Sequence, residues 1–126
     1  MQSLSGKATT MAWTLYHNPS CGTSRNVLAI LQEAGIEPAI VLYLKNPPDL
    51  VALRQLRDAL GEPARALLRG KEPLCAELGL DDPALDDEQI LAAIASHPAL
   101  LNRPVVTSPR GARVCRPSEV VRELLG

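Results

Sequence analysis

Aromatic residues are scarce in this sequence, and phenylalanine is missing. Trp13, Tyr16 and Tyr43 are the only aromatic side chains among 126 residues, of which 46% are hydrophobic. A chain of this length can bury a hydrophobic core of its own. With so few rings available, that core must consist mainly of leucine, valine, isoleucine and alanine.

The sequence also lacks an excess of charge of either sign. Its formal net charge is -1, so it has no electrostatic footprint for nucleic acid or for an anionic membrane surface. No signal peptide is recognisable, and no apolar run is long enough to span a bilayer. Neither nucleic acid nor a membrane is therefore expected as a partner.

Cysteine occurs in an odd number, without the spacing of a disulfide framework. The three cysteines are Cys21, Cys75 and Cys115. Together with the histidines they also lack the spacing of a zinc site. The pattern predicts a reduced, cytoplasmic protein.

The distribution of apolar and turn-forming residues predicts the order of strands and helices. A first strand ends at His17, a helix with apolar residues at helical spacing follows from Arg25, and a second strand covers residues 40–44. Since residues 40–44 are apolar throughout, this second strand is expected to be buried. Two further strands, at residues 105–107 and 112–115, are joined by a hairpin, and a last helix closes the chain.

Between these two groups of strands, residues 49–96 have only helical patterns. Asp49 is placed to cap the first of these helices, and the sequence DDEQ that begins at Asp86 has the form of a capping box. The whole order predicts an α/β fold of the thioredoxin-like type, with a four-stranded mixed sheet flanked by helices and an all-helical insert in the middle of the chain. Residues 1–11 are expected to form a disordered leader, and residues 12–126 a single domain.

Cys21 lies in the turn between the first strand and the first helix. There it faces the positive end of the helix dipole and backbone N–H groups that no helix carbonyl satisfies. Both favour the thiolate, which is the reactive form of cysteine, and both favour an approaching anion. Three positions further the chain has Ser24 instead of a second cysteine. The site therefore has no internal disulfide partner and would depend on an outside thiol.

The stretch from His17 to Arg25, HNPSCGTSR, resembles the active-site loop of the glutaredoxin-coupled arsenate reductases, the ArsC family. The resemblance covers about residues 14–125, and four further blocks are similar to the family in the same order: LYL with NPP from Leu42, RALLR from Arg65, LNRP from Leu101 and CRPSE from Cys115. It implies a thioredoxin-like fold in which Pro104 is the cis-proline that faces the catalytic cysteine.

The resemblance also implies a reaction and the residues that perform it. Cys21 would attack arsenate as the nucleophile, glutathione would join as co-substrate in a mixed thiol–arsenic adduct, and glutaredoxin would resolve the adduct so that arsenite leaves. No metal and no tightly bound cofactor is implied. His17 matches the residue that lowers the pKa of the cysteine, with Ser24 nearby on the loop. Three arginines match the residues that bind the oxyanion: Arg69, Arg103 and Arg116.

These three arginines suit an oxyanion for physical reasons as well. A guanidinium group stays charged and presents a planar fork of donors to two oxygens at once. Several such groups would neutralise the anion and lower the pKa of Cys21, so that an anionic thiolate can approach its substrate. Each of the three comes from a separate segment and precedes a glycine or a proline. A solvated or salt-bridged arginine is the alternative interpretation of each one taken singly.

Two other functions remain open on the sequence alone. A thioredoxin-fold regulator of the Spx type would bind a partner such as RNA polymerase, although its redox-sensing members need the C-x-x-C motif that Ser24 interrupts. A related glutathione-dependent thiol enzyme would act on a substrate without arsenic. Phosphate or sulfate would fit the same arginines without being reduced.

Overall fold

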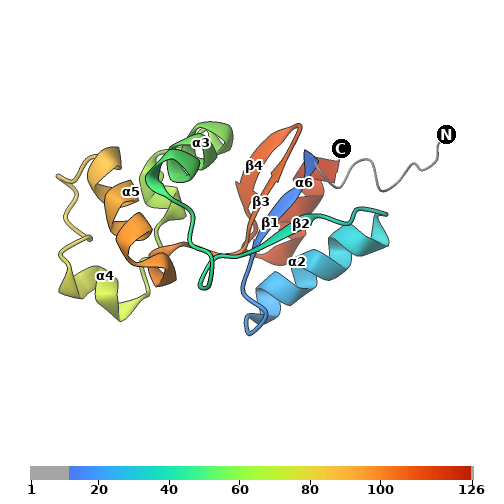
Figure 1. Ribbon diagram of the computed structural model, residues 1–126, viewed down its shortest axis with the longest axis horizontal. Coiled ribbons are helices and arrows are strands. Elements are labelled where there is room, and N and C mark those ends of the chain that lie inside the picture. Colours follow the sequence, from blue (N-terminus) through green and yellow to red (C-terminus); the bar gives the residue numbers. More distant parts are fainter. Residues whose placement is uncertain (1–11, 126) are drawn as a thin grey trace.

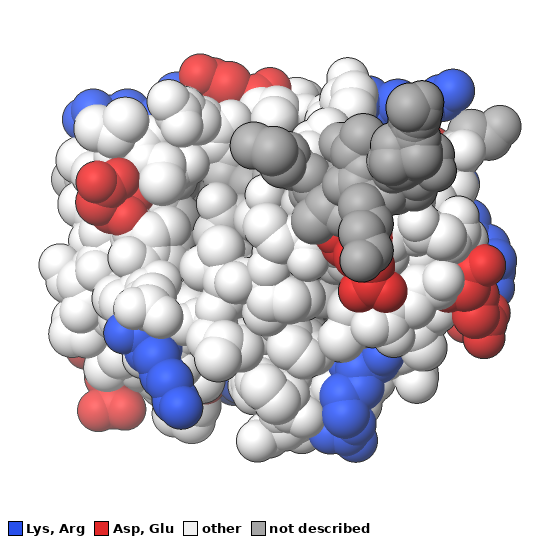
Figure 2. Space-filling model, turned by 45° about the vertical axis from the view of Figure 1, so that its right-hand side comes forward, with Lys and Arg blue, Asp and Glu red and all other residues white. Residues whose placement is uncertain are grey.

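The computed structural model describes residues 12–125, which form a four-stranded sheet with helices packed on both faces (Figure 1). The predicted leader, residues 1–11, lies outside the described residues. Figure 2 shows one face of the molecule, on which side chains of both charge signs are scattered among uncharged ones. Within the described part of the chain, no helix combines the length and the apolar character needed to cross a membrane.

Four short strands form the sheet in the order β2-β1-β3-β4. β1 (Thr14–His17) lies parallel to β2 (Ala39–Leu42) and antiparallel to β3 (Val105–Ser108), which forms a hairpin with β4 (Gly111–Val114). The crossover from β1 to β2 is made by α2 (Gly22–Glu33), because parallel neighbours cannot be joined by a tight turn. The mixed four-stranded sheet predicted from the sequence is confirmed.

Two hydrophobic clusters cover the two faces of this sheet. On one face, α2 and the C-terminal helices η4 (Ser118–Val121) and α6 (Arg122–Leu125) pack around Leu15 and Val106. On the other face, α3 (Leu50–Leu60) lies against β4 and connects the sheet to the remaining helices. Both clusters consist mainly of leucine, valine, isoleucine and alanine, as the shortage of aromatic residues requires.

The predicted burial of the second strand is wrong. β2 lies at the edge of the sheet, and Ala39 and Ile40 are exposed, with 43% of Ile40 accessible to solvent. The helices cover the strands in the middle of the sheet and leave this part of β2 uncovered. A short apolar run is typical of a strand, but it does not reveal whether the strand is central or at an edge.

The regular elements between β2 and β3 are all helices. After α3 they are η2 (Ala64–Leu67), α4 (Pro73–Glu77), α5 (Asp87–Ser96) and η3 (Pro98–Leu100). Oδ1 of Asp49 accepts a hydrogen bond of 2.8 Å from the N–H of Ala52, and Asp86 and Gln89 form both bonds of a capping box. The helix caps predicted at Asp49 and Asp86 are therefore confirmed. Such caps are local interactions that fix where a helix begins.

A short backbone pairing ties this helical part to the segment before β3. Leu68 and Leu101 form an antiparallel bridge, and the N–H groups of Arg69 and Asn102 each donate a hydrogen bond of 2.7 Å to a carbonyl on the opposite segment. In this pairing Arg69 lies opposite Leu100, and Asn102 lies opposite Leu67. The helical part that contains Arg69 is thereby joined to the segment that continues to Arg103.

Candidate active site

Cys21 closes a tight turn between β1 and α2. Its N–H donates to the carbonyl of Asn18 at 2.9 Å, and the side-chain oxygen of Asn18 accepts from the N–H of Ser20 at 3.0 Å. Arg25, one turn into α2, donates from Nη1 to the carbonyl of Pro19 at 2.8 Å. Cys21 is thereby held as the N-cap residue of α2 and stays partly exposed. At this position the helix dipole favours its anion.

The surroundings of Cys21 favour its thiolate. Burial by itself raises the pKa of the thiol, but the N–H of Ser24, the guanidinium groups of Arg103 and Arg116 and the N–H of Thr23 more than offset it. The net result is a pKa below the ordinary value for cysteine. Because the thiolate is the nucleophile, the lower pKa gives more reactive sulfur at neutral pH.

Of the three predicted arginines, Arg116 contacts Cys21, and Arg103 lies close enough to lower the pKa of its thiol. Nη1 of Arg116 lies 3.8 Å from Sγ of Cys21 and also donates to the carbonyl of Arg103 at 3.1 Å. Each of these arginines precedes a cis-proline, and the cis bond expected at Pro104 is confirmed. Nε of Arg103 is buried and has no hydrogen-bond partner within residues 12–125. An unpaired buried donor is costly, so this position suits an added anion.

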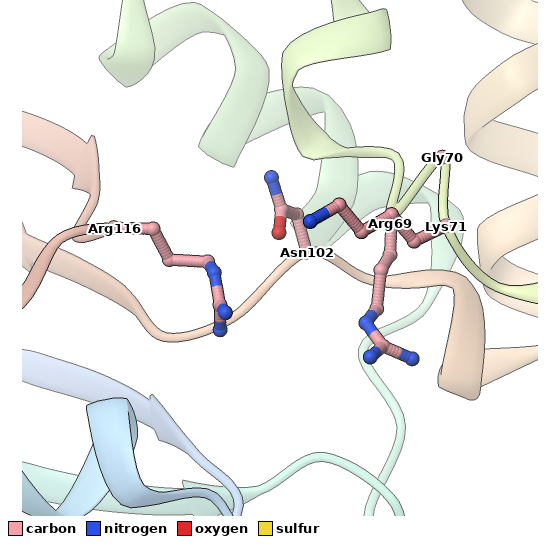
Figure 3. Close-up of a pocket in the computed structure, with 5 residues that line it drawn as sticks. All are labelled: Arg69, Gly70, Lys71, Asn102 and Arg116. Carbon is pink, nitrogen blue, oxygen red and sulfur yellow. The ribbon is translucent and has the colours of Figure 1, made fainter.

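Arg69 and Arg116 lie on opposite walls of a pocket, and Arg116 also contacts Cys21. The pocket has a volume of about 330 Å³. Figure 3 shows the residues that line it: Arg69, Gly70, Lys71, Asn102 and Arg116. Nη1 of Arg69 is 2.8 Å from Oε2 of Glu72, which neutralises part of its charge. The structure thus brings Arg103 and Arg116 to the thiol, and it holds Arg69 on the opposite wall of the pocket.

His17 and Ser24 form a buried pair next to the Cys21 turn. Nδ1 of His17 lies 2.5 Å from Oγ of Ser24, which also accepts a hydrogen bond of 3.1 Å from the N–H of Asn18. The contact fits either a hydroxyl that donates to Nδ1 or an Nδ1–H that donates to Oγ, because a hydroxyl oxygen can accept two bonds. Burial and then the charge of Arg25 lower the pKa of His17 and favour its neutral form. His17 is bonded to Ser24, and it is the backbone N–H of Ser24 that helps to lower the pKa of Cys21.

Replacement of Ser24 by alanine tests this pair. The change leaves Nδ1 of His17 and the N–H of Asn18 without their partner, so the free energy of unfolding should fall by about 1–3 kcal/mol. Urea denaturation measures the loss. Ser20→Ala is the matched control, because Ser20 is exposed and contributes only its backbone N–H to the turn. Equal stability of the two variants would contradict a structural role for the pair.

Tyr43, Lys71 and Asn102 belong to the site, although the sequence analysis did not identify them. The phenol of Tyr43 is buried, which raises its pKa and keeps it protonated, and its polar neighbours are the side chains of Asn18 and Arg103. Lys71 and Asn102 line the pocket. The available signals were a tyrosine between two leucines at the end of a strand and a second cation in an Arg-Gly-Lys sequence. Neither signal is specific without the fold.

The other two cysteines are buried and free. Cys75 lies in α4, and the sulfur of Cys115 donates to the carbonyl of Arg113 at 3.6 Å. Burial raises the pKa of Cys115 to about 12. Within residues 12–125, no three His, Cys, Asp or Glu side chains are grouped to hold a metal ion.

The three thiols should therefore differ in reactivity. Iodoacetamide is expected to modify Cys21 first, and the rate should rise with pH earlier than it does for an ordinary cysteine, because the lowered pKa gives thiolate at lower pH. Cys75 and Cys115 should react only after denaturation, since both are buried. Peptide mapping by mass spectrometry identifies the modified residue. Equal labelling of all three in the folded protein would contradict the structure.

Comparison with known proteins gives consistent matches over nearly the whole chain. The sequence model of the ArsC family matches residues 16–124. The arsenate reductase of Rhizobium meliloti (strain 1021) is 53% identical over 115 residues, which cover 91% of this chain and 82% of that protein. The arsenate reductase of Escherichia coli is 47% identical over 112 residues, which cover 89% of this chain and 79% of that protein.

Solved structures agree with this match. The arsenate reductase from Vibrio cholerae superposes with a TM-score of 0.85 at 43% identity, over 90% of this chain and 98% of that one. The thioredoxin-like α/β fold predicted from the sequence is thereby confirmed. The family match includes the Cys21 turn and the segments of all three arginines. Taken with the identity to curated relatives, it shows that the chain belongs to the ArsC family.

Proposed function

We propose that this protein reduces arsenate to arsenite with Cys21 as the nucleophile. The proposal is carried by a cysteine of lowered pKa at a helix N-terminus, with the guanidinium of Arg116 at 3.8 Å from its sulfur. Arg103 acts on the same sulfur and has a buried N–H available for an oxygen of the substrate. The curated relatives are named arsenate reductases, which supports the same substrate for this chain.

In the first step, the thiolate of Cys21 attacks the arsenic atom of arsenate. A sulfur–arsenic bond forms and an arsenic–oxygen bond breaks, and the oxygen leaves as water after it takes up a proton. Arsenic remains pentavalent at this stage. Arg103 and Arg116 would bind the remaining oxygens, and so reduce the repulsion between an anionic nucleophile and an anionic substrate. Arg69 would contact the substrate from the opposite wall.

The two electrons for the reduction must come from outside thiols, because Cys75 and Cys115 are buried and Ser24 replaces a second cysteine in the turn. A glutathione thiolate would attack the arsenic and displace a second water, which gives an adduct of arsenic with Cys21 and glutathione. A glutaredoxin thiolate would then attack the glutathione sulfur. A disulfide forms between them, the electron pair of the arsenic–sulfur bond passes to arsenic, and hydrolysis of the bond to Cys21 releases arsenite.

A coupled assay tests this proposal. With glutathione, glutaredoxin and glutathione reductase present, NADPH oxidation should require arsenate and should stop when glutathione or glutaredoxin is omitted. Phosphate and sulfate are the matched controls, because they fit the same arginines but are not reduced. Absence of turnover in the complete mixture would refute arsenate reduction and favour a thiol enzyme with another substrate or a thioredoxin-fold regulator. The cytoplasmic location stays a prediction of the sequence.

A further inference from the structure

The pocket beside Cys21 has more room than one arsenate ion fills. A water molecule takes up about 30 Å³ of liquid volume, so an anion of five heavy atoms occupies a small part of the pocket. The volume of about 330 Å³ is instead that of a small-molecule site. In Figure 3, Arg116 approaches from one side and Arg69 and Lys71 from the other, with Asn102 between them.

The pocket has three positively charged side chains, and only one of them is paired with a carboxylate, that of Glu72. Arg69 is paired with Glu72 at 2.8 Å. Lys71 and Arg116 form no ion pair within residues 12–125. The ammonium group of Lys71 points toward Asn102, whose amide lines the same space. These groups together would bind a carboxylate, which accepts several charge-assisted hydrogen bonds at once.

Arg116 joins this pocket to the reacting sulfur. Its guanidinium lines the pocket and lies 3.8 Å from Sγ of Cys21. A second ligand in the pocket would thus lie next to an arsenic atom held on Cys21. Such a ligand must be anionic, must fit beside the oxyanion and, for the reaction to continue, must offer a thiol. Glutathione is a small peptide with a thiol at its centre and a carboxylate at each end.

We propose that Lys71, with Asn102 beside it, binds a carboxylate of glutathione in this pocket and so presents its thiol to the arsenic on Cys21. This inference rests on the proposed function, in which glutathione is the second thiol. Lys71 is a positioning residue in this arrangement, since it touches the co-substrate far from the bond that forms. Its effect should therefore depend on the charge of the thiol compound and not on the chemistry at Cys21.

Disulfide exchange at Cys21 tests the pocket without arsenate. The thiolate of Cys21 attacks one sulfur of glutathione disulfide, a mixed disulfide forms on Cys21, and one glutathione leaves as its thiolate. Hydroxyethyl disulfide undergoes the same exchange but has no carboxylate. The rate constants for both compounds are measured by mass spectrometry of the intact protein, at low and at high salt.

Lys71→Ala should react about three- to fivefold more slowly than wild type with glutathione disulfide, the range expected for a partly exposed charge pair. Its rate with hydroxyethyl disulfide should be unchanged, and the difference should shrink at high salt. Lys45→Ala is the matched control, because it removes the same charge from the other described lysine. Lys45 lines a separate hollow of about 260 Å³ between the Cys21 turn and the end of β2.

Three results would overturn the inference. The first is that Lys71→Ala reacts with glutathione disulfide as fast as wild type. The second is that Lys71→Ala reacts more slowly with both disulfides by the same factor, which would mean that Cys21 itself had changed. The third is a loss in Lys45→Ala alone, which would place glutathione in the other hollow. The exchange assay contains no arsenate. A selective loss of rate with glutathione disulfide in Lys71→Ala would therefore support the glutathione site even if the protein did not reduce arsenate. Conversely, the protein could reduce arsenate without this selective loss. The two proposals therefore fail separately.

Discussion

Replacing Cys21 with serine is expected to abolish arsenate reduction while the protein stays folded. A serine hydroxyl is not ionised near neutral pH, so neither the helix N-terminus nor the guanidinium groups of Arg103 and Arg116 supply a nucleophile. Loss of a nucleophile of this kind lowers kcat by more than about 10⁴-fold. The coupled NADPH assay should therefore return to background for Cys21→Ser.

The fold should survive because the Cys21 side chain is partly exposed and its backbone bonds are retained. Stability to urea is expected to stay within about 0.5 kcal/mol of wild type, as is usual for substitutions away from the core. Cys75→Ala is the matched control, since it removes a thiol that lies in α4 and should keep its turnover. Residual arsenate turnover in Cys21→Ser, or its loss in Cys75→Ala, would show that another thiol is the nucleophile.

Replacing Arg103 with alanine is the second change with a large expected effect. It removes a donor to the oxyanion and one of the groups that lower the pKa of Cys21. Truncation of one partner of a hydrogen-bonded charge pair costs about 2 kcal/mol or more, so kcat/KM for arsenate should fall at least about 30-fold. The pKa of Cys21 should rise, and the pH at which iodoacetamide labels it should shift upward.

A lysine at position 103 separates the two contributions of this arginine. Arg103→Lys keeps the positive charge near Cys21 but has no planar fork for two oxygens. It should retain most of the low pKa of Cys21 and still bind arsenate poorly. Arg110→Ala, an exposed arginine in the turn between β3 and β4, is the control for loss of charge. Identical kinetics of Arg103→Ala and Arg110→Ala would rule out an oxyanion role for Arg103.

The local features of this fold follow from short-range interactions, and these could be predicted. The caps at Asp49 and Asp86 depend on residues within three positions along the chain. The strand–turn–helix around Cys21 depends on hydrogen bonds made by Asn18 and Arg25, which lie within four positions of Cys21 along the chain. Burial is a property of the whole molecule, and for this reason the exposed edge position of β2 was missed.

The sequence by itself determined the order of the elements, the position of Cys21 at a helix N-terminus and the lack of a second cysteine in its turn. Only the tertiary structure decided which of the three predicted arginines lie at the sulfur. The bridge between Leu68 and Leu101 brings the Arg69 segment beside Asn102, and Arg116 reaches Cys21 from a segment 95 residues away. Such contacts depend on how distant segments pack together, and no local sequence pattern encodes this. Arg116 therefore lies at the sulfur, whereas Arg69 and Lys71 form the far wall of the pocket.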